Sequence, residues 1–401
     1  MKILIVTNKP PYPLVDGGCI ATFNLLEAFS AAGQIVDVLS FSTQKHIGDS
    51  KLIPEYLTAK IGFRFVKIDT ELSPLAALRN LVFSRLPYNA QRFICEDFKN
   101  ELINILSTEN YDIVQLEGLY LCPYIDTIRQ FSKAKLSFRS HNIESEIWSR
   151  SAENEKATMK KGYMKILARR IARFEKSFIN KYDLLLPITE RDADAFASLG
   201  NTAPMHLAPA GYNVQKWKSH HGEDAYPQLF HLGALDWIPN QEGLLWFLDN
   251  VWGKVLRHKP DLQFFIAGRN APQAFANKIS AYPGVVYVGE VQDAVSFIHS
   301  QGIMIVPLLS GGGMRVKIIE GMALGKTIVT TPIGAEGISA THRENIIIAE
   351  SKYKFFAEIC TLIDNEGFCR SLGENARTFI KTNYDNEVIA ADVLKFYEEY
   401  L

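Results

Sequence analysis

The run of residues 310–320 combines the chemical groups needed to hold a phosphorylated ligand. Its sequence is SGGGMRVKIIE, and it follows a short apolar run typical of a strand. Arg315 falls in the first turn of the predicted helix, where a guanidinium can pair with a phosphate, and Lys317 and Glu320 share one helix face. This pattern predicts a cation beside a diphosphate and a carboxylate that accepts from ribose hydroxyls. A surface helix with an intrahelical Lys–Glu pair is the alternative. Three glycines let the backbone approach the ligand, with N–H groups unpaired at the helix start: Gly311, Gly312 and Gly313.

A second glycine cluster, GMALGKT at 321–327, is similar to a Walker phosphate loop but lacks one spacer residue between Gly321 and Gly325. It also stands at the end of a predicted helix and before a strand, which is the reverse of the Walker order. We therefore interpret Gly325 as a helix C-cap, whose carbonyl-rich end repels phosphate.

These residues require an α/β framework to position them. Short apolar runs alternate with helical patterns along the chain, as buried parallel strands do. A polar, proline-bearing stretch at 206–227 interrupts the alternation and predicts a linker. We expect two α/β domains, with ligands bound at the carboxyl ends of their sheets. The predicted strands are 2–8, 34–41, 111–117, 135–140, 183–189, 229–233, 262–268, 285–289, 302–307, 326–331 and 345–350.

The bulk composition narrows the function. The chain has 401 residues and a net charge of −1, which argues against nucleic acid as the main partner. Its five cysteines are scattered and odd in number, typical of reduced thiols in the cytoplasm rather than of disulfides or a zinc site. No signal peptide or transmembrane run is expected. Asp192 and Asp194 spell D-x-D, but they point to different sides of a predicted helix start, so we expect no metal.

The run PLLSGGGMRVKIIEGMALGKTIVTTPIGAEGI resembles the C-terminal signature of the family-4 retaining glycosyltransferases of the GT-B fold, also called group 1 glycosyltransferases. HLGALDWIPNQEGLLWFLDNVW at 231–252 is similar to the same family. The resemblance implies two Rossmann-like domains facing each other across a cleft. Their expected ranges are 1–205 for acceptor binding, 206–227 for the linker, 228–380 for nucleotide-sugar binding and 381–401 for a C-terminal helix packing back towards the N-terminal domain.

The resemblance also assigns roles. Glu320 corresponds to the second glutamate of the family's Glu-x7-Glu motif and is expected to bind ribose. Arg315 and Lys317 correspond to positions that face the diphosphate, and we count them as catalytic. His141, in the motif SHN, corresponds to a catalytic histidine near the transferred sugar or the acceptor. Further nucleotide-sugar-binding residues are expected in the N-terminal glycine turn and after the first C-terminal strand: Gly17, Gly18 and Gly233.

Two departures from the family pattern stand out. Gly312 occupies the position of the first glutamate of the motif, and the loop ALDWIPNQEG lacks the Arg and Lys that many members carry there. The positive charge required against a departing diphosphate therefore falls on Arg315 and Lys317.

Polar residues at strand ends in the N-terminal half are candidates for the acceptor side. These are Glu117, which ends the run 111–117, and two neighbours of His141, namely Asn142 and Glu144. For Glu117, polarity at the edge of the core is an equal alternative.

The stretch 156–181 is strongly basic and has apolar residues at helical spacing. Such a helix either lies peripherally on an anionic membrane or packs by its apolar face with its basic side solvated.

Together these features predict a cytoplasmic retaining glycosyltransferase, peripheral to the inner face of the cell membrane if the basic helix binds it. It would use a nucleoside diphosphate sugar, require no cofactor or obligatory metal, and act on a glycan or lipid-linked glycan in bacterial cell-envelope polysaccharide synthesis. A sugar-nucleotide epimerase on the same fold and a non-catalytic sugar-nucleotide-binding subunit remain as alternatives.

Overall fold

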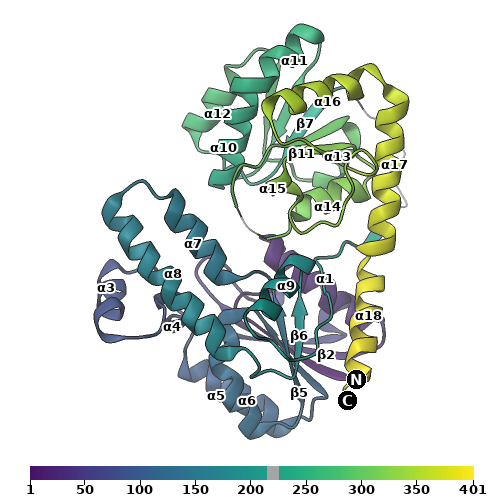
Figure 1. The fold of residues 1–401 in the computed structure, drawn as a ribbon. Coiled ribbons are helices and arrows are strands. Elements are labelled where there is room, and N and C mark those ends of the chain that lie inside the picture. The colour runs from purple at the N-terminus through teal and green to yellow at the C-terminus, as the bar shows by residue number, and fades with distance from the viewer. Residues whose placement is uncertain (215–224, 312) are drawn as a thin grey trace. The chain divides into compact units, whose positions relative to one another are not determined.

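A computed structural model describes residues 1–214, 225–311 and 313–401 (Figure 1). The chain divides into two compact units, here called the N-terminal unit, Met1–Gly211 with Asn386–Leu401, and the C-terminal unit, Tyr212–Asp385. The first boundary lies inside the stretch 206–227 and the second lies beyond residue 380. Gly312 and most of that stretch fall outside the described residues.

The N-terminal unit is built on a six-stranded parallel sheet of order β3-β2-β1-β4-β5-β6. Its strands are β1 Lys2–Thr7, β2 Ile35–Ser42, β3 Ile61–Lys67, β4 Ile113–Glu117, β5 Lys135–Ser140 and β6 Leu184–Pro187. The helices around it are α1 Gly17–Ala31, η1 Ser50–Leu52, α2 Glu55–Thr58, α3 Pro74–Phe83, α4 Tyr88–Gln91, α5 Glu96–Thr108, η2 Leu119–Tyr124, α6 Ile125–Phe131, α7 Glu144–Asn154, α8 Thr158–Phe178, α9 Glu190–Ser198 and α18 Asn386–Glu398.

Helices cover both faces of this sheet, which explains why its strands are continuously apolar. In β1, Leu4 and Val6 pack into the core shared with α5, α6 and α8, whereas Ile3 and Ile5 pack against α1 and α18 on the other face. Successive side chains along a strand point to opposite faces, so a run such as KILIV contributes to two cores.

The last helix, α18, belongs to the N-terminal unit although it follows the C-terminal unit in sequence. Its Tyr397 hydroxyl lies 2.6 Å from Gln115 Oε1 on β4 and 2.9 Å from Ser137 Oγ on β5. The preceding helix, α17 Glu366–Asn383, lies in the C-terminal unit, so the chain returns between Asp385 and Asn386 rather than at residue 380.

The C-terminal unit repeats the design with a parallel sheet of order β12-β11-β10-β7-β8-β9. Its strands are β7 Leu229–Leu232, β8 Phe264–Ala267, β9 Val285–Gly289, β10 Ile303–Val306, β11 Ile328–Thr330 and β12 Ile347–Ile348. Its other helices are α10 Ile238–Phe247, the π-helical turn η4 Leu248–Trp252, α11 Gly253–His258, α12 Gln273–Ser280, α13 Ala294–Ser300, α14 Val316–Ala323, α15 Pro332–Ala335 and α16 Lys352–Asp364.

Both sheets have the same internal strand order, and in each the order reverses beside its first strand. The reversal lies between β1 and β4 in one unit and between β7 and β10 in the other. Ligands of open α/β sheets bind outside the carboxyl ends of the strands at such a switch point. The two switch points are therefore the first places to look for a site.

Candidate functional site

The switch point of the C-terminal unit brings together the loop after β7 and the start of α14. Lys317, on α14, places its ammonium 2.6 Å from Asn240 Oδ1 on α10. A Cβ atom at Gly233 would lie 2.9 Å from Lys317 Nζ and 3.2 Å from His231 Nε2, so a side chain at this position would displace the Lys317 ammonium. The predicted residues Lys317 and Gly233 are thus neighbours, whereas Asn240 and His231 were not predicted as site residues.

Lys317 places a cation beside the loop after β7, which contains no Arg or Lys of its own. The loop 233–237 follows β7 without an Arg or Lys, and Lys317 reaches it from α14. The His231 ring is fully buried, and its Nδ1 lies 2.8 Å from the Ile305 carbonyl oxygen. Burial and the nearby Lys317 lower the pKa of His231 well below its usual range, so the ring is neutral.

The pKa values of Lys317 and Glu320 are both shifted from their usual ranges. Burial, with a smaller contribution from Arg315, lowers the pKa of Lys317 to about 7. Burial raises the pKa of Glu320 to about 7. The Glu320 carboxylate forms no hydrogen bond or ion pair with any residue that the structure describes, and it does not pair with Lys317. The intrahelical Lys–Glu pair of the alternative interpretation is therefore absent within the described residues.

Arg315 lies just before the first turn of α14, whereas the sequence predicts it within that turn. It is the N-cap residue of α14, whose first turn begins at Val316, and it is only 5% exposed. Its guanidinium donates to the Gly313 carbonyl at 2.5 Å and stands over the Trp237 ring at 5.8 Å from the centroid. Gly311 and Gly313 adopt φ angles of 112° and 74°, which lie in the left-handed region that favours glycine.

GMALGKT takes no part in this site. Gly325 directly follows Leu324, the C-cap residue of α14, and has a φ of 71°. Lys326 donates to the carbonyls of His299 and Gln301 at 3.0 and 2.6 Å. Because Lys326 and Thr327 precede β11, they lie at the amino edge of the sheet, opposite the switch point. The interpretation of this segment as a helix end is confirmed.

The switch point of the N-terminal unit contains His141 and Glu117, which the sequence analysis proposed separately. His141 Nε2 lies 2.5 Å from Glu117 Oε2. The Glu117 carboxylate is buried and also accepts from Thr22 Oγ1 at 3.2 Å and from Gln115. A carboxylate on one ring nitrogen fixes the orientation of an imidazole.

Arg139, fully buried on β5, completes this network. It stands 3.5 Å from Glu117 Oε2 and donates to the carbonyls of Ala21, Ala208 and Pro209. Burial alone would raise the pKa of Glu117, but Arg139 and His141 outweigh burial and lower this pKa to about 2. The carboxylate is therefore charged and satisfied. An arginine inside the apolar run KLSFRS gave no sign of this role.

The two neighbours of His141 are placed differently. The Asn142 carbonyl accepts from Ser140 Oγ at 2.9 Å. Glu144 begins α7 and accepts from the Tyr120 hydroxyl at 2.8 Å, and burial raises its pKa. The adjacent backbone N–H groups of Glu144 and Ser145 donate to Glu175 on α8. Glu144 is thus engaged within its own unit.

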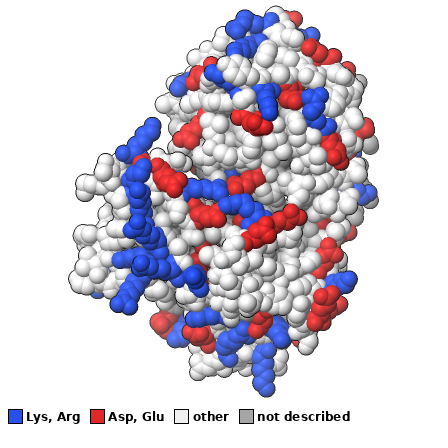
Figure 2. Space-filling view, viewed as in Figure 1, with Lys and Arg blue, Asp and Glu red and all other residues white. Residues whose placement is uncertain are grey.

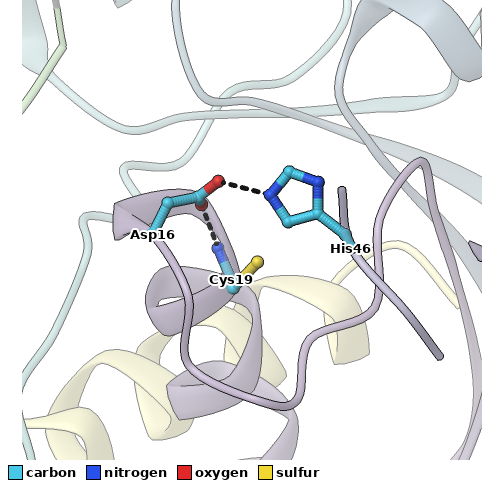
Figure 3. A group of neighbouring side chains, drawn as sticks. All are labelled: Asp16, Cys19 and His46. Atoms are coloured by element: carbon cyan, nitrogen blue, oxygen red, sulfur yellow. Dashed lines mark hydrogen bonds and ion pairs between the residues drawn. The ribbon is translucent and has the colours of Figure 1, made fainter. Parts of the chain in front are cut away.

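Gly17 and Gly18 begin α1, and the side chains of Asp16, Cys19 and His46 gather at this turn (Figure 3). Asp16, the N-cap residue, accepts from the N–H groups of Gly18 and Cys19 at 2.9 and 3.0 Å, and lies 3.1 Å from His46 Nε2. Lys9 Nζ contacts both Asp16 oxygens at 2.7 and 2.9 Å. Hydrogen bonds from His46 and Lys9 outweigh burial and hold the pKa of Asp16 far below its usual range.

Asp16, Cys19 and His46 place potential metal-ligand atoms within 4.8 Å of one another. Lys9 already occupies both carboxylate oxygens, and burial raises the pKa of Cys19 to about 11, so its thiol stays protonated. A metal ligand must be deprotonated. The residues therefore suit a hydrogen-bonded helix cap better than a metal. Similarly, Asp192 donates its backbone N–H to the Thr189 hydroxyl at the start of α9, as expected of a helix N-terminus.

Comparison with known proteins agrees with this organisation. Residues 226–365 match the family model for group 1 glycosyl transferases. An uncharacterised 44.6 kDa protein of the cps region of Klebsiella pneumoniae is 26% identical over 98% of this chain and 99% of its own. The capsular polysaccharide biosynthesis glycosyltransferase CapM of Staphylococcus aureus is 26% identical over 30% of this chain and 32% of its own.

Solved structures match the whole chain. Anabaena HepE in complex with UDP superposes with a TM-score of 0.69, at 12% identity and full coverage of both chains. Sucrose-phosphate synthase of Thermosynechococcus elongatus superposes with a TM-score of 0.71, at 15% identity over 100% of this chain and 99% of the other. The chain therefore has the two-domain α/β fold of the GT-B glycosyltransferases, as predicted, and carries a group 1 glycosyl transferase domain at residues 226–365.

Proposed function

We propose that this protein transfers a sugar from a nucleoside diphosphate sugar to a glycan or lipid-linked glycan, with retention of anomeric configuration, in cell-envelope polysaccharide synthesis. The observation that carries the proposal is that the Lys317 ammonium and the Glu320 carboxylate, which has no partner among the described residues, lie on one face of α14 at the switch point of the C-terminal sheet. The relatives from a cps region and from capsule biosynthesis support the pathway class.

The proposed donor grip follows from the charges. Lys317 and Arg315 oppose the charge that develops on the departing diphosphate, and fixed charges act strongly there because the site is shielded from water. A diphosphate beside Lys317 favours its ammonium form and offsets the lowered pKa. Glu320 accepts hydrogen bonds from ribose hydroxyls. We propose no obligatory metal, since two cations are already placed for this role.

UDP and UDP-glucose are the first donors to test. HepE structures contain UDP or UDP-glucose, and superpose on this chain with TM-scores of 0.69 and 0.68. From the N-terminal unit we propose that His141, held by Glu117, hydrogen-bonds the transferred sugar or the acceptor. We also propose that the turn formed by Gly17 and Gly18 approaches the donor, since the absence of side chains lets the backbone come close.

A panel of nucleotides and nucleotide sugars in a thermal-shift assay tests the binding part, because a ligand at a hundred times its dissociation constant stabilises the fold by about 2.7 kcal/mol. Glu320→Ala should abolish the shift with the preferred nucleotide. Glu290→Ala, at an exposed carboxylate of the same unit, is the matched control. An unchanged shift in Glu320→Ala would overturn the assignment.

The transfer part needs a turnover assay with the donor that the panel selects and a polysaccharide-derived acceptor. Formation of a product with the donor's anomeric configuration, read by NMR, supports retaining transfer. Nucleotide affinity without release of nucleoside diphosphate would point instead to a binding subunit, and isomerised sugar nucleotide would point to an epimerase.

A further inference from the structure

Helix α3 presents its apolar side to solvent and its polar side to the protein. Leu75, Leu78, Val82 and Phe83 are 80%, 58%, 65% and 83% exposed, whereas Asn80 is 6% exposed. Asn80 is the buried residue of this helix, and none of its leucines, its valine or its phenylalanine is buried. An amphipathic helix of a globular protein normally has the opposite orientation. An apolar face turned outwards in this way indicates an interaction surface.

Polar contacts, not apolar packing, hold α3 in place. Asn80 Nδ2 donates to the Leu86 carbonyl at 3.1 Å. Arg170 of α8 donates to the carbonyls of Asn80 and Leu81 at 3.2 and 2.7 Å. The arginine therefore joins the end of α3 to α8, and the outward apolar side chains are not required for this attachment.

The neighbouring helix α8 carries a stripe of cations on its solvent side. The spacing of four, four and three residues places the members of this basic stripe on one helix face: Lys165, Arg169, Arg173 and Lys176. All four are exposed, and none pairs with a carboxylate among the described residues. The opposite face of α8 packs Leu167, Ile171 and Phe174 into the core.

Figure 2 shows Lys and Arg side chains running over the α7–α8 pair, beside an uncharged surface at the outer edge where Figure 1 places α3. Ile166 and Met159 of α8 add exposed apolar side chains, and Met159 is 92% exposed. Arg79 lies within the outward face of α3 and is exposed. A long cationic side chain at such a position can keep its charge at the polar boundary while its stem stays among apolar groups.

We propose that α3 and the basic stripe of α8 together form a docking surface for an anionic lipid bilayer. The apolar side chains of α3 enter the boundary between headgroups and acyl chains, and the cations of α8 bind the lipid phosphates. The positive charge of the basic stripe favours an anionic bilayer over a second copy of this chain as the occupant of the surface. A second copy of this chain would bring the same basic stripe against itself, whereas an anionic bilayer complements it. The surface lies within the N-terminal unit and does not depend on the proposed donor site.

Flotation of the whole chain with vesicles tests the proposal without any nucleotide. Vesicles with 30 mol% phosphatidylglycerol in phosphatidylcholine should carry the protein, at low salt more than at 0.5 M salt, because the cationic contribution is screened. Phosphatidylcholine vesicles alone should bind it at least tenfold more weakly. Equal binding to both vesicle types, or no binding to the anionic ones, would overturn the proposal.

Two surface variants separate the contributions. The triple variant Arg169→Gln, Arg173→Gln, Lys176→Gln should lose at least tenfold in partitioning, since each cation near an anionic surface contributes roughly fivefold. The triple variant Leu75→Ser, Val82→Ser, Phe83→Ser should lose binding even at low salt. The matched control replaces three exposed cations of the C-terminal unit: Arg257→Gln, Lys259→Gln and Lys278→Gln.

The control variant should bind vesicles as the unchanged chain does. Equal losses of vesicle binding in all three variants would show that binding does not depend on α3 and the basic stripe in particular, and would overturn the assignment. Because the replaced side chains are exposed, thermal melting should be nearly unchanged, and each variant is used only after that check. Sedimentation without vesicles completes the test: a dimer that the α3 variant abolishes would identify a second copy as the occupant and contradict the proposal.

Discussion

The two units have the same strand order, but the pKa values of the buried glutamates at their switch points are shifted in opposite directions. At the switch point of the N-terminal unit, Glu117 is charged, with its pKa lowered to about 2 by Arg139 and His141. At the switch point of the C-terminal unit, Glu320 has no partner among the described residues and a pKa raised to about 7, while Lys317 has its pKa lowered to about 7. The Glu117 network is complete within the protein, whereas the Glu320 carboxylate has no partner among the described residues, as the proposed nucleotide-sugar site requires.

This difference suggests a division of labour. A satisfied network holds His141 in one orientation before any substrate arrives. An unsatisfied carboxylate and a desolvated ammonium cost stability in the empty protein, and the proposed donor would relieve that cost on binding. Mutations at the two sites should therefore affect different observables, stability in one unit and ligand affinity in the other.

The largest expected effect is at Arg139. Arg139→Met leaves the Glu117 carboxylate buried without its cation, so the free energy of unfolding at neutral pH should fall by about 3–5 kcal/mol. Urea unfolding followed by circular dichroism measures this. Because Glu117 has a depressed pKa in the folded state, its ionisation contributes stability above the unfolded value of about 4.5, and the contribution is lost as the pH falls towards 2.

The double variant Arg139→Met, Glu117→Leu is the control, because removing both charges removes the unpaired group. It should recover part of the lost stability. A single variant that loses less than 1 kcal/mol would show that Arg139 does not carry the network.

Lys317 should show the opposite behaviour. Lys317→Met removes a desolvated ammonium, so the melting temperature without ligand should stay the same or rise. Affinity for the preferred nucleoside diphosphate should fall by about 2 kcal/mol, or roughly 30-fold, as for a hydrogen bond to a charged group. Titration calorimetry measures this, with Lys278→Met as the control at an exposed lysine of the same unit. Unaltered affinity would remove Lys317 from the proposed grip.

A smaller effect, in the pH dependence of stability, belongs to Glu320. A carboxyl whose folded pKa is raised stabilises the fold below its unfolded pKa, and that stability is lost as the pH rises through the folded pKa. The unchanged chain should therefore lose about 1–3 kcal/mol more than Glu320→Gln between pH 4.5 and 7. Glu175, whose pKa burial also raises to about 7, is present in both chains, so its contribution cancels.

Urea unfolding of both chains at several pH values in this window is the measurement. Parallel curves for the two chains would mean that Glu320 is solvated, and would weaken the contrast between the units.

Much of the fold could be predicted because parallel strands buried on both faces leave continuous apolar runs. The residues of the proposed donor site could be singled out from the sequence because Arg315, Lys317 and Glu320 lie within one turn-and-helix segment. Contacts between distant segments were not visible. Lys317 and Asn240 are 77 positions apart, and no feature of the neighbouring sequence predicts that an ammonium from α14 lies beside the loop after β7.

Arg139 was equally hidden. Its partners come from β4, α1 and the segment 208–209, so its burial depends on the assembled unit rather than on the run KLSFRS. The apolar face of α3 was hidden for a different reason, because a sequence of leucines at helical spacing normally predicts burial. It is exposed because Asn80 and Arg170 direct the other side inwards.

The smallest effect is expected at Asp16, and it tests whether the N-terminal glycine turn is complete without a ligand, as the Glu117 network is. Asp16→Asn keeps an oxygen for the N–H groups of Gly18 and Cys19 but removes the charge that pairs with Lys9 and His46, so stability should fall by about 0.5–1 kcal/mol. Asp16→Ala should cost about 1 kcal/mol more, because the helix cap is lost as well. Thermal melting of the two variants separates charge from capping. Equal melting temperatures would show that the charge pairs contribute nothing beyond the cap. A higher melting temperature for Asp16→Asn than for the unchanged chain would show that the Asp16 charge destabilises this turn in the absence of a ligand, as we infer for Glu320.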